Sequence, residues 1–169
     1  MDPRYKPDCS NVLFSGDGRF HLEAAMIANP QLKAYRYDPY DQQFTAEYYD
    51  HDLMKLNRKG QIEKARSAQT FGIILSTLGR QGNPKIMENV KRMLQKQNKD
   101  YICILLSEIF PDKLALFEDV DCFIQIACPR LSIDWGLAFD KPLLTPYEAA
   151  VLLQECQWQS EIYPMDFYR

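Results

Sequence analysis

Residues 71–94 read FGIILSTLGRQGNPKIMENVKRML, and this stretch decides the fold class. The apolar run 71–76 is short and β-branched, which is typical of a buried strand. The loop 77–83 follows, and Pro84 then opens a helix at its first position, with Asn83 as the cap. The apolar positions of this helix recur at helical spacing: Ile86, Val90, Met93 and Leu94. The stretch therefore predicts a strand, a loop and an amphipathic helix.

The same alternation continues on both sides of this stretch. Further strands are predicted at 11–15, 34–37, 101–106 and 122–127, and further helices at 19–28, 52–69, 111–117 and 146–154. Strands that alternate with helices pair in parallel through right-handed crossovers. The sequence therefore predicts a doubly wound α/β fold with a parallel sheet (Rossmann- or flavodoxin-like), one domain complete and a second in part.

The domain boundaries follow from this pattern. We expect part of one α/β domain at 11–50, a connecting helix at 51–70, a complete α/β domain at 71–154 and a C-terminal tail at 155–169. Strand 11–15 is expected to be buried, and the aromatic stretch 40–49 to be irregular. In the long helix, the buried stripe is expected to comprise Leu53, Leu56, Ile62 and Ala65.

Composition excludes several classes of protein. Hydrophobic residues make up 46% and charged residues 25% of the 169 residues, and the net charge is −3. This balance predicts no general attraction to nucleic acid or to anionic lipid, and the sequence lacks a signal peptide and a membrane span, so we expect a cytoplasmic protein. The cysteine count is five with no Cys-x-x-Cys pair, which disfavours both a disulfide framework and a self-contained zinc site.

The turn Gly16-Asp17-Gly18-Arg19 lies between a predicted strand and a helix. This order resembles a dinucleotide-binding fingerprint, but His21 stands where the third glycine belongs, and Asp17 would bring a negative charge toward a pyrophosphate. A tight turn that uses glycine flexibility, or a site for a different ligand, are the alternatives.

The loop 77–83 resembles an anion-binding cradle. It carries two glycines and Arg80 ahead of a helix N-terminus, but it lacks the lysine of a Walker A loop, which binds nucleoside triphosphates. A solvated strand–helix turn is the alternative.

Cys128 stands just past the predicted strand 122–127, where ligands bind in open parallel sheets. A thiolate there is a candidate ligand or nucleophile, and the nearby Arg130 would favour the ionised form. Alternation along the strand predicts that Cys122 lies in the core, and mid-strand Cys103 is also predicted to be a packing residue.

Seven motifs together resemble the diphthamide biosynthesis protein 1 family. They are GDGRFHLEAAMIANP at 16–30, YRYDPY at 35–40, TLGRQG at 77–82, LSEIFP at 106–111, ACPRLSIDWG at 127–136, KPLLTPYEAA at 141–150 and YPMDFY at 163–168. The resemblance covers the family's C-terminal half.

The resemblance implies a radical enzyme that uses S-adenosylmethionine and a [4Fe-4S] cluster. Such an enzyme transfers a 3-amino-3-carboxypropyl group to a histidine of translation elongation factor 2, pairs with a related second subunit, and receives electrons from a donor protein. Three α/β domains each give one cysteine to the cluster, and Cys128 matches the ligand of the third domain. By position and charge we further expect Gly16, Asp17, Gly18 and Arg19 near S-adenosylmethionine, and Arg80 or Arg130 at its carboxylate.

The family's other two ligand cysteines have no counterpart in this sequence. We therefore expect this chain alone to be inactive. The alternatives to a transferase subunit are a non-catalytic module that binds the second subunit or the elongation factor, and an unrelated dinucleotide-binding domain.

Overall fold

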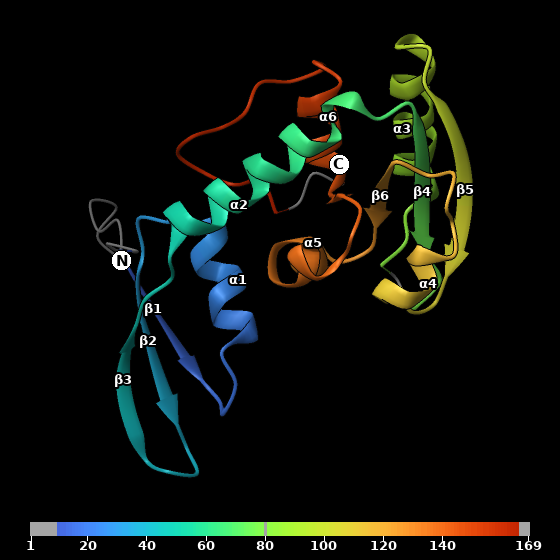
Figure 1. Ribbon diagram of the computed structural model, residues 1–169. Coiled ribbons are helices and arrows are strands. Elements are labelled where there is room, and N and C mark those ends of the chain that lie inside the picture. Colours follow the sequence, from blue (N-terminus) through green and yellow to red (C-terminus); the bar gives the residue numbers. More distant parts are fainter. Residues whose placement is uncertain (1–9, 80, 166–169) are drawn as a thin grey trace. The chain divides into compact units, whose positions relative to one another are not determined.

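The computed structural model describes residues 10–79 and 81–165 of the chain (Figure 1). The contacts between Cα atoms divide these residues into two compact units. The first unit comprises residues 10–52 and 159–165, and the second comprises residues 53–158. Most of the helix that we expected to be a connector is therefore part of the second unit.

The first unit is built on a three-stranded sheet. Its strands are β1 (Asn11–Ser15), β2 (Lys33–Asp38) and β3 (Gln43–Glu47), and α1 (Phe20–Ala28) connects the first two. β1 and β2 are parallel, as the crossover requires, whereas β3 returns antiparallel to β2. The expectation of an irregular segment here was wrong, because residues 39–42 form a hairpin turn in which Gln42 has a positive φ of 53°.

Helix α1 covers one face of this sheet. Leu22 and Met26 of the helix are buried against Ala34 of β2. β1 alternates between exposed and half-buried residues, and Leu13 is 62% exposed. The prediction that strand 11–15 is buried was therefore wrong, since α1 protects only the alternate residues of β1.

The second unit contains a four-stranded parallel sheet in the order β5-β4-β6-β7 (Figure 1). The strands are β4 (Thr70–Ser76), β5 (Asp100–Leu106), β6 (Cys122–Ile126) and β7 (Leu143–Leu144). The helices are α2 (His51–Lys64), α3 (Pro84–Lys96), α4 (Pro111–Ala115), α5 (Pro129–Trp135) and α6 (Pro146–Leu152), with 3₁₀ turns at Ala65–Ser67 and Gly136–Ala138.

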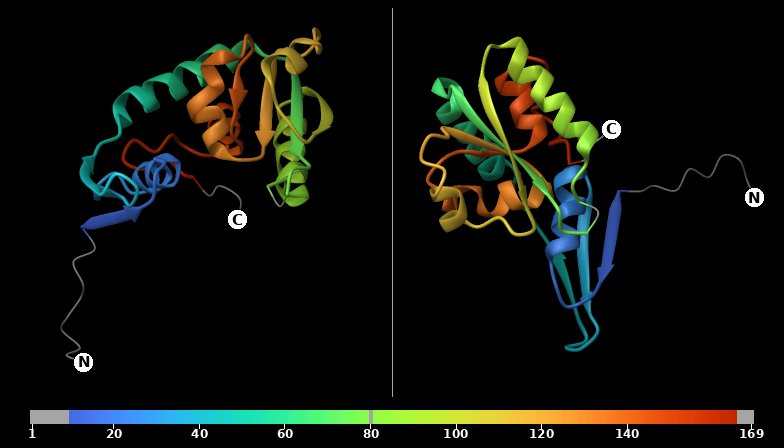
Figure 2. Two further views of the ribbon diagram at one scale, coloured as in Figure 1. Left: turned by 90° about the horizontal axis from the view of Figure 1, so that it is seen from below. Right: turned by 90° about the vertical axis from the view of Figure 1, so that its right-hand side faces the viewer.

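Helices cover both faces of this sheet (Figure 2). On one face, α3 and α6 pack on a core that includes Ile73, Val90 and Ile124. On the other face, α4 packs on Ile74 and Phe123, with half-buried Leu131 of α5 beside them. The doubly wound α/β fold predicted from the sequence is confirmed.

The predicted helix starts are also confirmed. The Asn83 side chain accepts a hydrogen bond of 3.0 Å from the Lys85 amide at the start of α3. At the start of α6, Thr145 and Glu148 form a reciprocal capping box, with bonds of 2.9 and 3.2 Å. These caps satisfy amide groups that have no partner within their helix.

The buried stripe predicted for the long helix is confirmed at Ile62 and Ala65 but is wrong at Leu53 and Leu56. Leu53 and Leu56 are 52% and 68% exposed, whereas Arg58 and Gln61 are buried, together with the apolar Ile62. A polar side chain can occupy such a position only when it is hydrogen-bonded. Arg58 meets this condition through partners on three other segments of the second unit.

The order of the strands in the sheet determines how exposed Cys122 and Cys103 are. Cys122 lies on the central strand β6 and has no exposed surface, as predicted. Cys103 lies on the edge strand β5 and is exposed, so the prediction that it packs in the core was wrong.

Candidate functional site

Three loops of the second unit meet at the carboxyl edge of its sheet. All the strands run in parallel, so the segments that follow β4, β5 and β6 emerge on the same side. The Thr77 amide donates a bond of 2.9 Å to the Leu106 carbonyl, which joins the first two loops. Ligands of parallel α/β sheets bind at this edge.

Cys128 emerges from this edge as the residue that precedes α5. Its thiol is free and its side chain is half-buried. Its backbone is extended, with φ −88° and ψ 128°, and its carbonyl accepts a bond of 3.0 Å from the Leu131 amide in the first turn of α5. None of the predicted helices covered the residues after Cys128, but Pro129 at the first helical position starts a helix there.

Gln125 anchors the backbone around Cys128. Its side-chain Nε2 donates to the Cys128 carbonyl and to Ser132 Oγ, both at 3.0 Å, and its Oε1 accepts from the Ala127 amide at 2.9 Å. The sequence analysis missed this residue. The available signal was a single amide within the otherwise apolar strand β6.

Arg130 lies on α5, two residues after Cys128. It is only 5% exposed, and its Nε lies 2.9 Å from both carboxylate oxygens of Asp134, with Nη2 at 2.8 Å from Oδ2. This pair joins residues one helical turn apart. The guanidinium that we expected to face a cofactor carboxylate is therefore already paired with a carboxylate of the chain.

Hydrogen bonds from the backbone and from a charged side chain also hold the predicted glycine turn of the first unit in place. The Gly16 amide donates to the Tyr37 carbonyl at 3.0 Å, and Arg36 Nη1 donates to the Asp17 carbonyl at 2.9 Å. A Cβ added at Gly18 would meet no heavy atom within 4 Å, so the backbone there is accessible.

Arg19 precedes α1 and has several partners. Its Nε lies 3.1 Å from Glu47 and 3.4 Å from Glu23, and its Nη2 donates to the Tyr48 carbonyl at 3.1 Å. Glu47 also lies 3.3 Å from Arg36 Nε, so one carboxylate serves two guanidinium groups. Arg80, the remaining predicted residue, lies outside the described residues.

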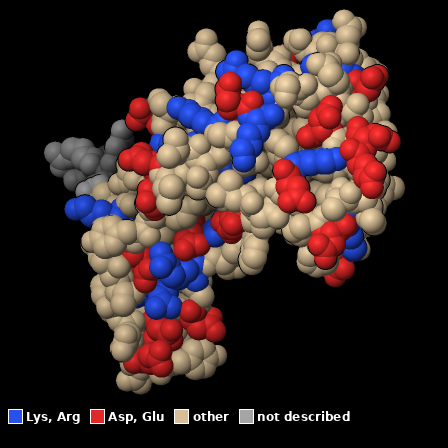
Figure 3. Space-filling model, viewed as in Figure 1, with Lys and Arg blue, Asp and Glu red and all other residues tan. Residues whose placement is uncertain are grey.

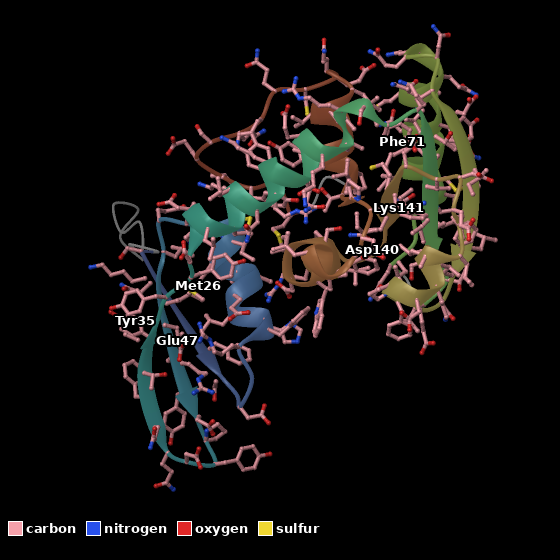
Figure 4. All side chains as sticks on the ribbon, viewed as in Figure 1. Met26, Tyr35, Glu47, Phe71, Asp140 and Lys141 are labelled. Carbon is pink, nitrogen blue, oxygen red and sulfur yellow. The ribbon has the colours of Figure 1, made fainter. Side chains whose placement is uncertain are left out.

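Two hollows contain none of the predicted site residues. In the first unit, a hollow of about 270 Å³ is lined by residues that include Met26, Tyr35 and Glu47. In the second unit, a hollow of about 250 Å³ is lined by residues that include Asp140 and Lys141, which are labelled in Figure 4. The Lys141 ammonium donates hydrogen bonds to the carbonyls of Phe117 and Glu118. Both are hollows of their own unit, and neither the glycine turn nor Cys128 lines them.

The described residues do not offer a complete metal site. Within residues 10–79 and 81–165, no group of three or more His, Cys, Asp or Glu side chains could hold a metal ion. Iron–sulfur clusters are held by several cysteine thiolates. A cluster bound at Cys128 would therefore need further ligands from outside the described residues.

The structure shows how charged side chains are distributed over the surface and how apolar the helices are. On the face shown in Figure 3, Lys and Arg side chains lie among Asp and Glu side chains over the second unit. None of the described helices combines the length and the apolar character that a membrane span requires.

The fold and the free thiol of Cys128 define a class: a parallel α/β protein with a cysteine at the carboxyl edge of its sheet. The family model for diphthamide synthesis proteins matches residues 2–164. The chain belongs to this diphthamide synthesis family, as the resemblance of its motifs predicted.

Similar proteins carry one name. The chain is 61% identical over 161 residues to 2-(3-amino-3-carboxypropyl)histidine synthase subunit 1 of Nematostella vectensis, covering 95% of the chain and 34% of the relative. It is 59% identical to the protein of that name from Schizosaccharomyces pombe, covering 93% of the chain and 36% of the relative. The chain thus spans about a third of the length of these curated relatives.

A solved structure supports the same relationship. The crystal structure of Dph2 from Pyrococcus horikoshii with a 4Fe-4S cluster matches with a TM-score of 0.74 and 29% identity. The match covers 92% of this chain and 43% of that protein. The resemblance therefore extends from sequence to three-dimensional structure.

Proposed function

We propose that this chain forms the part of a diphthamide synthase subunit 1 that supplies Cys128 as one thiolate ligand of a [4Fe-4S] cluster. The observation that carries the proposal is the position of Cys128: a free, half-buried thiol at the carboxyl edge of a parallel sheet. The similarity to a Dph2 structure that contains a 4Fe-4S cluster supports it.

The reaction that we infer for the whole enzyme is a transfer of the 3-amino-3-carboxypropyl group. The group would pass from S-adenosylmethionine to a histidine of translation elongation factor 2, with methylthioadenosine leaving from the cofactor and a proton leaving from the histidine. The bound cluster would supply the electron for radical cleavage of the cofactor, after reduction by a donor protein. We further propose that the enzyme acts in the cytoplasm as a heterodimer with the second synthase subunit, which the name of the relatives suggests.

The domain roles follow from the same proposal. The first unit would belong to the middle α/β domain of the longer enzyme, and the second would be its third domain. The other two ligand cysteines would come from parts of the enzyme that this sequence lacks, because the described residues offer no complete ligand set. The chain alone would then be inactive.

Cofactor binding is proposed for the predicted glycine turn and arginines. The open backbone at Gly18, next to Gly16 and Asp17, would allow close approach of S-adenosylmethionine. Arg19 and Arg130 are paired with carboxylates, so either would have to exchange a partner to bind the cofactor. Arg80 is the other candidate, beside Arg130, for the carboxylate of the cofactor, and its replacement by alanine in the complete enzyme should weaken cofactor binding.

A chimera tests the proposed function directly. This chain would replace the matching segment of the Schizosaccharomyces pombe subunit 1, to which it is 59% identical. After anaerobic purification with the second subunit, we expect bound iron and sulfide, the visible absorption of an iron–sulfur cluster, and transfer of the group to elongation factor 2. Cys128→Ser should abolish all three, whereas Cys103→Ser, at an exposed cysteine, should leave them intact.

A chimera that holds no cluster and transfers no group would favour the second candidate function, a non-catalytic module that binds the partner subunit or the elongation factor. The observation that favours this alternative is that residues 10–79 and 81–165 contain no group of three or more His, Cys, Asp or Glu side chains that could hold a metal ion. A folded chimera that binds the second subunit but holds no cluster, or holds one without Cys128, would exclude the ligand role of this residue.

A further inference from the structure

We propose that Gln125 is the positioning residue that sets the geometry of the Cys128 thiol. Gln125 has no exposed surface, although its strand β6 lies between β4 and β7, and its register partner on β4 is the buried Ile74. A primary amide in such a place is costly unless its polar atoms are hydrogen-bonded. An apolar side chain would suit this position better if packing were the only requirement.

Both polar atoms of the Gln125 side-chain amide form hydrogen bonds with the segment that carries Cys128. Oε1 accepts from the Ala127 amide, before the cysteine, and Nε2 donates to the carbonyl of Cys128 itself. The second bond of Nε2 goes to Ser132 Oγ, one turn into α5. The cysteine is thereby tied to the strand before it and to the helix after it.

Only an amide can make this set of bonds as a neutral group. A carboxylate could accept from Ala127 but could not donate to a carbonyl, and a thioether accepts only weakly and cannot donate. Ligand residues are commonly held in place by hydrogen bonds from neighbouring groups, and these determine how well the site is formed before the metal binds. The position of the thiol thus depends on a residue that does not itself reach the thiol.

The significance of this clamp for a cluster rests on the proposed function, but the clamp itself can be tested on this chain without a cluster. The background variant carries Ser at Cys9, Cys103 and Cys156, so that Cys128 is the reactive thiol and Cys122 stays buried. Gln125→Met removes all three bonds at similar volume. Ile124→Val, on the same strand and facing the other core, is the control for a general loss of stability.

The readout is the rate constant for alkylation of Cys128, measured beside the free energy of unfolding. Because loss of the hydrogen bonds frees the segment to open locally, we expect Gln125→Met to raise the rate by about fivefold or more. Ile124→Val should lower stability and leave the rate unchanged. Equal rates in the two variants would overturn the proposal.

A milder variant keeps the test decisive if Gln125→Met does not fold. Ser132→Ala removes one partner of the amide, and we expect a rise of about twofold, since one bond is lost; no rise would overturn the proposal. In the chimera, Gln125→Met should also lower the iron content. If alkylation changes as expected while the Cys128→Ser chimera keeps its cluster, the clamp stands and the proposed function fails.

Discussion

Arg58 and Glu148, which are 90 residues apart in the chain, form a buried bidentate ion pair. Arg58 Nε lies 2.7 Å from Glu148 Oε1 and Nη2 lies 2.6 Å from Oε2, and the side chains are 1% and 0% exposed. The same guanidinium donates to the carbonyls of Ser132 and Leu143. One residue of α2 therefore joins α5, β7 and the capping box of α6.

Loss of this arginine should be costly. Arg58→Met leaves Glu148 as a buried charge without this partner, so we expect the free energy of unfolding to fall by about 3–5 kcal/mol. Arg66→Met is the matched control: its ion pair with Glu63 is about 70% exposed, and its loss should cost less than about 1 kcal/mol. Denaturant unfolding of both variants checks this, and similar losses would contradict it.

Gly60 should tolerate alanine with a gain in stability. It lies inside α2, and a Cβ there would meet no heavy atom within 4 Å. Alanine restricts the unfolded chain and favours the helix, so we expect a gain of about 1 kcal/mol. Gly82→Ala is the contrasting control, because its Cβ would collide with the backbone carbonyl of Ser76, and a loss of about 1–3 kcal/mol is expected. Thermal unfolding of both variants decides, and a loss at Gly60 would be evidence against the continuous helix.

The cysteines should differ sharply in reactivity. Burial raises the pKa of the Cys122 thiol far above its ordinary value of 9.0, and burial also raises that of Cys156. Since the thiolate is the reactive form, we expect exposed Cys103 to be alkylated first and Cys122 to remain unmodified until the protein unfolds. Timed alkylation followed by peptide mass spectrometry measures the order, and early labelling of Cys122 would contradict the central position of β6.

Asp121 should make the free energy of unfolding depend on pH in the acidic range. Its carboxylate accepts bonds of 2.9 and 2.8 Å from the amides of Thr70 and Gln69, and these bonds lower its pKa below the ordinary 3.8. A pKa that is lower in the folded state stabilises the protein above pH 3.8, and this stabilisation is lost as pH falls through the folded value.

We therefore expect Asp121→Asn to be less stable than the parent protein at neutral pH and to approach it in acid. Asp119→Asn, at an exposed carboxylate two residues away, is the control for the loss of a carboxylate from this loop. Unfolding curves measured from neutral pH to below the ordinary pKa of Asp121 test this, and a constant difference would contradict it.

Local patterns were enough to predict the place of Cys128 and the elements of the second unit other than α5 and β7. The spacing of Val90 and Leu94 reports which residues share a helix face, and the caps at Asn83 and Thr145 depend on neighbours within three residues. Cys128 could be placed because the end of an apolar strand is visible in the sequence. The family was also recognisable, since its motifs are contiguous.

Long-range contacts decided the rest. Periodicity cannot tell an edge strand from a central one, which is why Cys103 and Cys122 were both predicted to be buried although strand order exposes the first. Nor can it reveal that Arg58 is buried while Leu53 is exposed, because the partner of Arg58 is distant in sequence. The clamp of Gln125 is intermediate: its partners are close in sequence, but only the start of α5 at Pro129 brings Ser132 back to the amide. Burial and partnership depend on which surfaces the fold brings together, and a local pattern carries no information on that.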